Sequence, residues 1–193
     1  MRALLLAAGY GKRLQPITIS QPKCLVDIGG KPLLGRWLDT LGVLGVGPVL
    51  VNLHHLAGDV QSYIAQRGDS ASVVTVYESA LLGTAGTIRK NRGFFGRDKV
   101  MVIHADNLCL SNLLLFKQAH NLRPKKTQIT MLTFRSDDPT ACGIVEVDDD
   151  IDGTQYVVNW PNGEPTMVTA DELELVKENK MRITKRQLKK IIQ

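Results

Sequence analysis

Cysteine is scarce in this chain, and the spacing of the few cysteines excludes two classes of small protein. Cys24, Cys109 and Cys142 are odd in number, lie far apart and form no C-x-x-C pair. This spacing argues against a disulfide framework and against a zinc site. We therefore expect all three to be reduced thiols.

Long apolar runs are missing as well. No stretch of the chain reaches the roughly 18 uninterrupted apolar residues that a membrane-spanning helix needs. The apolar run at the amino terminus has no cleavage-like site before its glycines, so it does not resemble a signal peptide. The sequence predicts a soluble, cytoplasmic protein with no membrane partner.

A strong excess of charge of one sign is also absent. The formal net charge is +5, and the cationic excess is spread thinly along the chain. Residues 177–193 form the one locally basic stretch, and such a stretch is typical of a solvated helix face. This distribution argues against nucleic acid as a partner, and RNA binding through the basic tail stays open only as a third and weakest hypothesis.

Apolar sequence is plentiful enough for one core, since 44% of the residues are hydrophobic. Strand-like and helix-like patterns alternate along the first 150 residues. The expected strands are 3–8, 49–53, 72–77, 99–104, 128–134 and 144–147, and the expected helices are 32–41, 56–66, 84–91 and 112–120. This alternation predicts an α/β fold, a Rossmann-like three-layer sandwich with a mostly parallel sheet.

The pattern changes beyond residue 150. Residues 155–159 and 166–169 read as a hairpin around a Trp-Pro-Asn-Gly turn, and a capping box at Thr169 predicts a helix, with a second helix from Thr184. We therefore expect a main domain at 1–150 and a small C-terminal appendage at 151–193, made of a hairpin and basic helices.

The turn after the first expected strand is the most informative stretch. Gly9 and Gly11 would let backbone N–H groups approach an anion, and Arg13 and Lys23 add two cations nearby. The turn lacks both the third glycine of a dinucleotide fold, where Leu14 stands, and the Gly-Lys-Ser/Thr of a P-loop. A site for several phosphate charges fits these residues, because Arg can bind two oxygens at once and Lys acts as a point charge.

Asp106 follows the apolar strand 99–104, where a carboxylate is costly unless it binds a cation or caps a helix. One interpretation is a Mg²⁺ ligand, since this ion takes oxygen ligands and often only one or two carboxylates. The alternative is a simple turn made by Asp106 and Asn107. The adjacent His54 and His55 would point to opposite sides of an extended strand, so we interpret them as surface groups at the strand end.

Four stretches resemble, in the right order, the sugar-phosphate nucleotidyltransferases, the enzymes that make nucleotide-diphosphate sugars. They are LAAGYGKRLQPITISQPKCLVDIGGKPLL at 6–34, ESALLGTAG at 78–86, HADN at 104–107 and CGIVE at 142–146. The resemblance covers roughly residues 1–148. Within the family, the sequence looks most like the mannose-1-phosphate guanylyltransferases and glucose-1-phosphate nucleotidyltransferases.

The resemblance implies a reaction and a set of site residues. The reaction is nucleotidyl transfer from a nucleoside triphosphate to a sugar 1-phosphate, with GTP and mannose 1-phosphate as the favoured pair and Mg²⁺ as the cofactor. The implied catalytic residues are Arg13, Lys23 and Asp106, of which Asp106 binds the metal. The implied nucleotide-binding residues are Leu6, Ala7, Ala8, Gly9, Gly11, Glu78, Gly83 and Thr84. The implied sugar-binding residues are Gly143 and Glu146.

Some local alternatives stay open beside these roles. Glu78 is either a base or ribose contact or a surface group at a strand end. Residues 82–86 either hold a base ring against backbone or form a tight strand-to-helix turn with Thr84 as N-cap.

The sequence departs from the family pattern after Glu146. A Glu-Lys-Pro segment, an Asn-Ala-Gly-like stretch and a second acidic metal ligand have no counterpart there. Either the appendage supplies substitutes, or a partner chain or second copy does, or the chain is a truncated or fused relative with little activity. The alternative function is a catalytically impaired nucleotide- or sugar-phosphate-binding protein, or a regulatory partner of a complete enzyme.

Overall fold

The computed structural model describes residues 1–68, 72–125, 127–134, 145–146, 156–159, 165–168 and 182–183. The chain divides into two compact units, Met1–Leu108 and Cys109–Gln193. The boundary expected at residue 150 falls outside the described residues. Each unit is described by itself.

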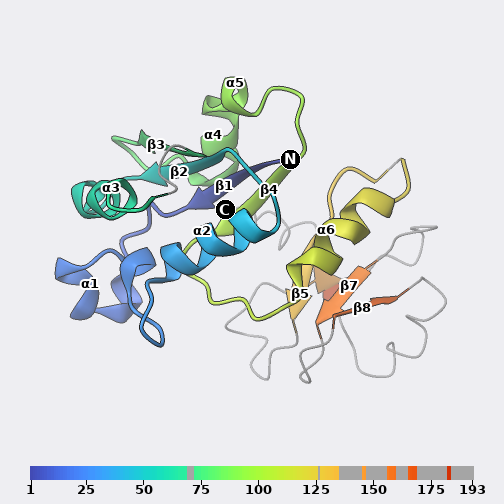
Figure 1. Ribbon diagram of the computed structural model, residues 1–193, viewed down its shortest axis with the longest axis horizontal. Helices are drawn as coiled ribbons and strands as arrows, with labels where there is room; N and C mark the ends of the chain where they lie inside the picture. The colour runs from blue at the N-terminus through green and yellow to red at the C-terminus, as the bar shows by residue number, and fades with distance from the viewer. Residues whose placement is uncertain are drawn as a thin grey trace. The chain divides into compact units, whose positions relative to one another are not determined.

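The first unit is built on a parallel sheet with the strand order β3-β2-β1-β4 (Figure 1). These strands are β1 (Arg2–Leu6), β2 (Val49–Leu53), β3 (Val73–Tyr77) and β4 (Val100–His104). Leu6 in β1 is in register with Asn52 on one side and with His104 on the other. All the strands therefore end at the same edge, and the turns that follow them share that edge.

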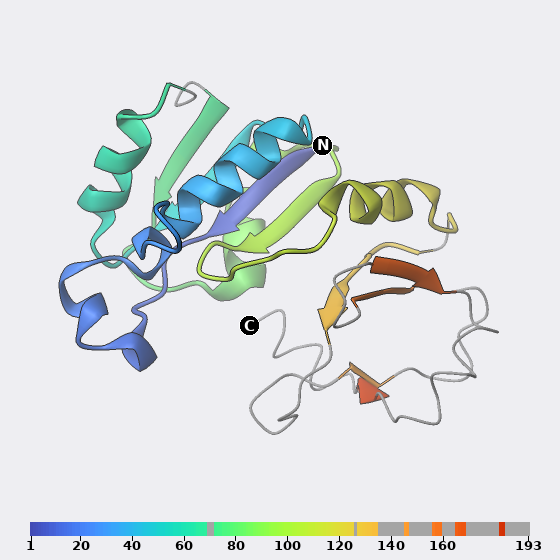
Figure 2. The same ribbon diagram turned by 60° about the horizontal axis from the view of Figure 1, so that its bottom comes forward.

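Helices cover both faces of this sheet, as Figures 1 and 2 show. One face carries α2 (Leu33–Val43) and α3 (Ala57–Ala65), and the other carries α4 (Gly83–Lys90) and α5 (Arg92–Phe95). On the α4 and α5 face, Leu4, Leu50 and Phe95 form a buried apolar cluster. The α/β sandwich expected from the alternating pattern is confirmed.

Helix α2 packs as its apolar spacing predicts. Its buried side chains include the five that recur at helical spacing in the sequence, namely Leu33, Leu34, Trp37, Leu38 and Leu41. Gly35 lies on the side facing α3, where a Cβ atom would collide with the Tyr63 hydroxyl. In this arrangement the absence of a side chain at Gly35 makes room for the Tyr63 hydroxyl.

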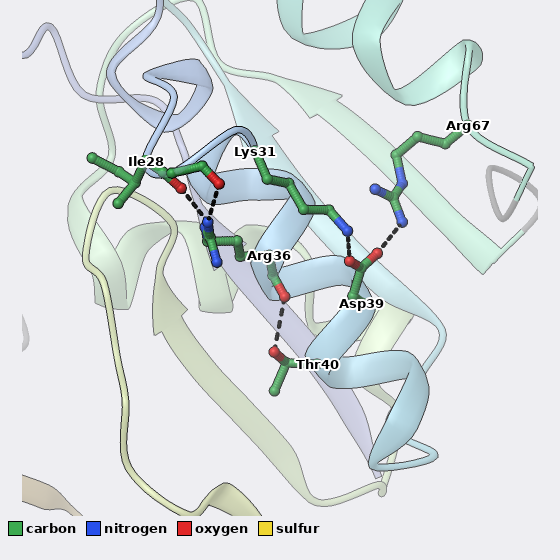
Figure 3. A network of polar contacts seen from close by, with 7 residues as sticks. Ile28, Lys31, Arg36, Asp39, Thr40 and Arg67 are labelled. Carbon is green, nitrogen blue, oxygen red and sulfur yellow. Dashed lines mark hydrogen bonds and ion pairs between the residues drawn. The ribbon is translucent and has the colours of Figure 1, made fainter. Parts of the chain in front are cut away.

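The polar face of α2 is tied to its surroundings by charged side chains (Figure 3). Arg36 donates hydrogen bonds to the backbone oxygens of Ile28 and Gly29, and so holds the preceding turn. Asp39 pairs with Lys31 and, at 2.8 Å, with Arg67 beyond the end of α3. Because these groups are partly exposed, the ion pairs contribute little to stability and mainly orient the turn and the helices.

Short helical turns fill the connection between β1 and α2. They are η1 (Lys12–Leu14), α1 (Ile17–Ser20) and η2 (Lys23–Leu25). None of them was expected from the sequence, because elements of three or four residues are too short to show a helical period. They carry the chain from the glycine turn to Lys23.

The second unit contains α6 (Leu113–Leu122), which begins where the Asn112 side chain accepts hydrogen bonds from the N–H groups of Leu114 and Leu115. Its strands are β5 (Leu132–Phe134), β6 (Val145–Glu146), β7 (Tyr156–Asn159), β8 (Pro165–Val168) and β9 (Arg182–Ile183). Strands β7 and β8 pair antiparallel, which confirms the hairpin. The expected capping box at Thr169 and the helix from Thr184 lie outside the described residues.

Element boundaries agree with the sequence pattern within a few residues in most places. Strand β2 has the expected bounds, and α3 is one residue shorter at each end than expected. Strand β5 is shorter, because it begins at Leu132 rather than at Gln128. Within the described part of the chain, no helix is long and apolar enough to cross a membrane.

Candidate active site

The glycine turn leaves the carboxyl end of the central strand β1. Ala7 and Ala8 are buried directly after the strand, whereas Gly9 and Tyr10 are exposed. The N–H of Ala7 donates a 2.8 Å hydrogen bond to Oδ1 of Asn52 in β2. Among the described residues, no hydrogen bond is found for the N–H groups of Ala8, Gly9 and Tyr10, so these donors are available to an anion.

Gly11 has a backbone conformation and a packing environment that both require glycine. Its φ is +65°, and an added Cβ would lie 2.8 Å from Cγ2 of Thr18 and 3.2 Å from Cβ of Lys23. The Thr18 hydroxyl also donates a 2.8 Å hydrogen bond to the Gly11 carbonyl oxygen. The turn therefore packs directly against the segment that carries Lys23.

Lys23 and Asp106 meet across 83 positions of sequence, with Nζ 2.6 Å from Oδ2. Their side chains are 21% and 33% exposed, so the pair is partly shielded but open to a ligand. Asp106 follows β4, and the N–H of its neighbour Ala105 bonds to the Leu6 carbonyl oxygen at 3.1 Å. The structure thus brings Gly11, Lys23 and Asp106 together at one edge of the sheet.

Arg13 lies in η1, two residues beyond Gly11, and is exposed. No hydrogen bond or ion pair of its guanidinium is found among the described residues. A guanidinium with this freedom can reach for a planar anionic group without breaking an existing pair.

Asp106 is a suitable ligand for a hard divalent cation. Its carboxylate already pairs with the Lys23 ammonium, so it is placed to bind a cation. The described residues contain no group of three or more His, Cys, Asp or Glu side chains that could hold a metal by themselves. A single carboxylate, that of Asp106, fits Mg²⁺, which commonly takes one or two carboxylates and completes its coordination shell with phosphate oxygens and water.

Cys24 is buried beside this pair and stays a neutral thiol. Its burial, with a smaller contribution from the Asp106 carboxylate, raises the pKa of the thiol to about 12. A thiolate is therefore disfavoured there, and Cys24 neither repels an anion nor acts as a nucleophile near neutral pH.

Glu78 is buried, with an exposed fraction of 1%, so the interpretation as a surface strand end is wrong. Its Oε1 accepts hydrogen bonds from the Thr87 hydroxyl at 2.5 Å and from the Asn52 amide at 3.3 Å. Its Oε2 accepts from the N–H of Leu82 at 3.3 Å. The contact of Glu78 with a nucleotide stays a prediction, and the carboxylate has a full set of protein partners.

The two histidines after β2 both contact neighbouring segments, His54 the glycine turn and the end of β3, and His55 the connection that follows the turn. Nδ1 of His54 lies 2.6 Å from the Glu78 carbonyl oxygen, which can only accept, so Nδ1 carries the proton and Nε2 accepts from the Tyr10 hydroxyl at 2.7 Å. Nε2 of His55 donates to the Thr18 carbonyl oxygen at 3.1 Å. They are structural contacts rather than free surface groups.

Helix α4 begins at Gly83, with Leu82 at the cap position and no side-chain cap. The alternative role of Thr84 as N-cap is therefore wrong, and its side chain is buried inside the first turn. Gly83 is exposed with a φ of +69°, next to open space. Gly143 lies outside the described residues, and for Glu146 the structure describes only the backbone, in β6.

Asn52 and Thr87 are polar side chains that sequence reasoning missed. Both are buried, and they link the β1 turn to the start of α4. Asn52 stands inside an otherwise apolar strand, VLVNL, and this break in the apolar run was the available signal.

The fold and the site together define a parallel α/β domain with an anion-receptive turn, a lysine and a carboxylate at the carboxyl edge of its sheet. A profile described as nucleotidyl transferase matches residues 2–165. The chain belongs to the nucleotidyl transferase family, which confirms the resemblance.

Several curated relatives support the same grouping. The mannose-1-phosphate guanyltransferase of Pichia angusta is 28% identical over 160 residues, which are 78% of this chain and 42% of that protein. A putative mannose-1-phosphate guanyltransferase of Sulfolobus acidocaldarius is 29% identical over 150 residues, covering 76% of this chain and 40% of the relative. The chain spans less than half the length of these relatives.

Solved structures show the same fold. The crystal structure of HddC from Yersinia pseudotuberculosis complexed with GMP-PN has a TM-score of 0.63 and 27% identity, covering 77% of this chain and 65% of that chain. A putative glucose-1-phosphate thymidylyltransferase from Bacillus anthracis has a TM-score of 0.67 at 21% identity, covering 100% of this chain and 84% of that chain. At that identity the likeness concerns the fold.

Proposed function

We propose that this chain carries the nucleotide-binding part of a sugar-1-phosphate nucleotidyltransferase, which transfers a nucleotidyl group from a nucleoside triphosphate to a sugar 1-phosphate and releases pyrophosphate. The observation that carries the proposal is the Lys23 Nζ to Asp106 Oδ2 contact of 2.6 Å, beside Gly11 of the glycine turn. Membership of the nucleotidyl transferase family supports it.

The charge distribution suits the joining of two anions. A sugar phosphate can attack a triphosphate only if their mutual repulsion is overcome and the leaving pyrophosphate is stabilised. In the proposed roles, the N–H groups of Ala8 and Gly9 bind the triphosphate, exposed Arg13 contacts the departing phosphates, and Lys23 lies between the α-phosphate and the sugar phosphate. These groups act through position and charge.

No protein nucleophile or general base is needed. The attacking oxygen of a sugar phosphate is already ionised near neutral pH, and in-line positioning supplies much of the rate. The buried thiol of Cys24, with its pKa raised to about 12, stays neutral beside the cations. No thiolate charge at Cys24 therefore offsets the positive charge of the neighbouring cations.

Asp106 would hold Mg²⁺, with Lys23 released towards the phosphates. The ion, when bound, would neutralise phosphate charge and stabilise the developing charge on the leaving group. The contribution of the chain is to present one carboxylate oxygen beside the triphosphate turn and to keep Lys23 within reach of both.

GTP and mannose 1-phosphate are the proposed substrate pair. Curated relatives are described as mannose-1-phosphate guanyltransferases, and one solved relative is complexed with GMP-PN. The contacts of Gly83 and Thr84 with the nucleotide, and of Gly143 and Glu146 with the sugar, belong to the same proposal.

The proposal extends to setting and assembly. The free thiols of Cys24 and Cys109 suit a reducing compartment such as the cytoplasm. One relative, from Drosophila pseudoobscura pseudoobscura, is described as a catalytic subunit, which supports a partner chain or a second copy as a source of further sugar contacts.

Pyrophosphate release across a panel of nucleoside triphosphates and sugar 1-phosphates, with Mg²⁺ present, tests the activity. We expect release that is highest with GTP and mannose 1-phosphate and that falls by on the order of a hundredfold in Asp106→Asn. Asp98→Asn is the matched control, because Asp98 precedes β4, pairs with Arg2 at 2.6 Å and carries the same chemistry at the opposite edge of the sheet. Its rate should equal that of the wild type.

Two results would contradict the proposal in different ways. Saturable GTP binding without pyrophosphate release above the blank would favour the binding protein without turnover. Absence of triphosphate binding in calorimetry would remove the enzyme and the binding protein alike.

A further inference from the structure

The buried hydrogen bonds around Glu78 all run in one direction. The N–H of Ala7 donates to Oδ1 of Asn52, whose amide then donates to Glu78. The Thr87 hydroxyl and the N–H of Leu82 donate to the same carboxylate. Ala7 belongs to the proposed triphosphate turn and Leu82 is the cap residue of α4, so the carboxylate is linked to both loops, directly to Leu82 and through Asn52 to Ala7.

This direction fixes how the Asn52 amide is turned. A backbone N–H can only donate, so the Asn52 oxygen must face Ala7 and its NH₂ must face Glu78. A carboxylate satisfies that NH₂ because both of its oxygens accept. The ionised group also lies at the amino end of α4, where the helix dipole favours negative charge.

We propose that Glu78 is a positioning residue that sets the geometry of both nucleotide-binding loops through Asn52 and Leu82, rather than a group that contacts the nucleotide. This inference rests on the proposed function for its ligand. The exposed fraction of 1% for Glu78 and the three protein donors on its carboxylate carry the inference.

An amide at this position cannot satisfy the same partners. If the side-chain oxygen introduced by Glu78→Gln faces Asn52 and Thr87, the introduced NH₂ opposes the N–H of Leu82. If that NH₂ faces Asn52 instead, two donors meet there, and turning the Asn52 amide moves the conflict to Ala7. Glu78→Gln therefore leaves one donor without an acceptor, at Ala7, Asn52 or Leu82, although the shape of the side chain is almost unchanged.

A paired substitution should repair the network. In Asn52→Asp with Glu78→Gln, the new carboxylate at position 52 accepts from Ala7 and from the new NH₂ at position 78. Thr87 can donate to that carboxylate, and the new amide oxygen at position 78 accepts from Leu82. Net charge is that of the wild type, so rescue tests the direction of the hydrogen bonds and would not follow from a direct contact between Glu78 and a ligand.

The experiment uses the full chain and two readouts. Calorimetry measures GTP binding with Mg²⁺, and NMR hydrogen exchange measures protection of the Ala7 and Leu82 amides. We expect Glu78→Gln to weaken GTP binding by about tenfold and to speed exchange at one of the two amides. Asn52→Asp alone should weaken binding as well, because it places two carboxylates together, and the double variant should return both readouts to within about twofold of the wild type.

Asp39→Asn is the matched control. It makes the same carboxylate-to-amide change in the same unit, at a group bonded to Lys31 and Arg67 instead of to either loop (Figure 3). Its GTP affinity and the exchange of both loop amides should equal those of the wild type.

The positioning role and the proposed function fail in different ways. Absence of binding of every nucleoside triphosphate by the wild type sinks the proposed function, while exchange at Ala7 and Leu82 still tests the network. Unchanged binding and exchange in Glu78→Gln would overturn the positioning role. So would a double variant that fails to recover protection, or that fails to fold where the wild type folds.

Discussion

Asp106→Asn should change the binding of metal-free polyphosphate and of its magnesium complex in opposite directions. The carboxylate now shares the Lys23 ammonium, with 2.6 Å between Nζ and Oδ2. Neutralising it frees that ammonium for a phosphate oxygen and removes a negative charge from the anion site. The same change removes the proposed ligand of the metal, so binding of the magnesium complex should weaken.

The exposure of the pair sets the size of the effect. A hydrogen bond to a charged group contributes about 1.5 to 3 kcal/mol. Side chains that are 21% and 33% exposed are partly screened by water, which reduces the contribution to about 1 kcal/mol. Metal-free tripolyphosphate should therefore bind Asp106→Asn about fivefold more tightly than the wild type. With Mg²⁺, we expect binding at least about tenfold weaker.

Calorimetry with inorganic tripolyphosphate separates the two arms. One titration contains EDTA and the other excess Mg²⁺, at one fixed ionic strength because salt screens exposed charges. Asp98→Asn serves as the control in both arms. Lys23→Met should weaken metal-free binding, because it removes the cation and leaves the carboxylate facing the anion, and Lys31→Met is its control, since Lys31 pairs with Asp39.

The direction in which Asp106→Asn changes the affinity for metal-free tripolyphosphate tests this reasoning. Weaker binding of metal-free tripolyphosphate by Asp106→Asn would refute the reasoning, because Lys23 would then not be limited by its present partner. Tighter binding by Asp106→Asn in both titrations would support the charge balance and contradict the proposed role of Asp106 as a metal ligand.

Two further predictions concern the same edge of the sheet. Gly11→Ala should lower the free energy of unfolding by about 1 to 3 kcal/mol in urea titrations, since the φ of Gly11 is +65° and a Cβ would lie 2.8 Å from Cγ2 of Thr18. Gly9→Ala, with open space around the Cβ position, should leave the free energy of unfolding unchanged and weaken GTP binding. Equal stabilities of the two variants would count against the packing described for Gly11. Cys24 should be alkylated at pH 9 at least about a hundredfold more slowly than the less buried Cys109, as read by mass spectrometry, because burial raises the pKa of the Cys24 thiol to about 12. Between about pH 9 and 12 the folded state then holds a proton that the unfolded chain releases, so the free energy of unfolding should fall as the pH rises. Cys24→Ala should make that fall less steep.

Much of the architecture followed from local patterns. The apolar spacing of α2 predicted which of its side chains are buried, and the short apolar run of β2 predicted its bounds. Each pattern depends only on which side chains share a face of one element. The turns between Gly11 and Lys23 were missed, because their conformation depends on contacts such as Thr18 with Gly11 rather than on a period.

The candidate site was predicted in part. The family resemblance named Gly11, Lys23 and Asp106 as site residues, and the structure places the three at one edge of the sheet, where its parallel strands end. The acidic group at position 78 was also singled out. Its burial was not foreseen, because a glutamate after a strand carries no local sign of the donors that surround it.

By itself, the sequence determined the order of strands and helices, the glycine positions and the family, since these depend on neighbouring residues along the chain. The tertiary structure decided which distant side chains meet. Parallel register brings Asn52 beside the end of β1, and the same sheet brings Asp106 to Lys23. Hydrogen-bond direction and shared charge arise only from such contacts, because they depend on distances between elements that no local spacing encodes.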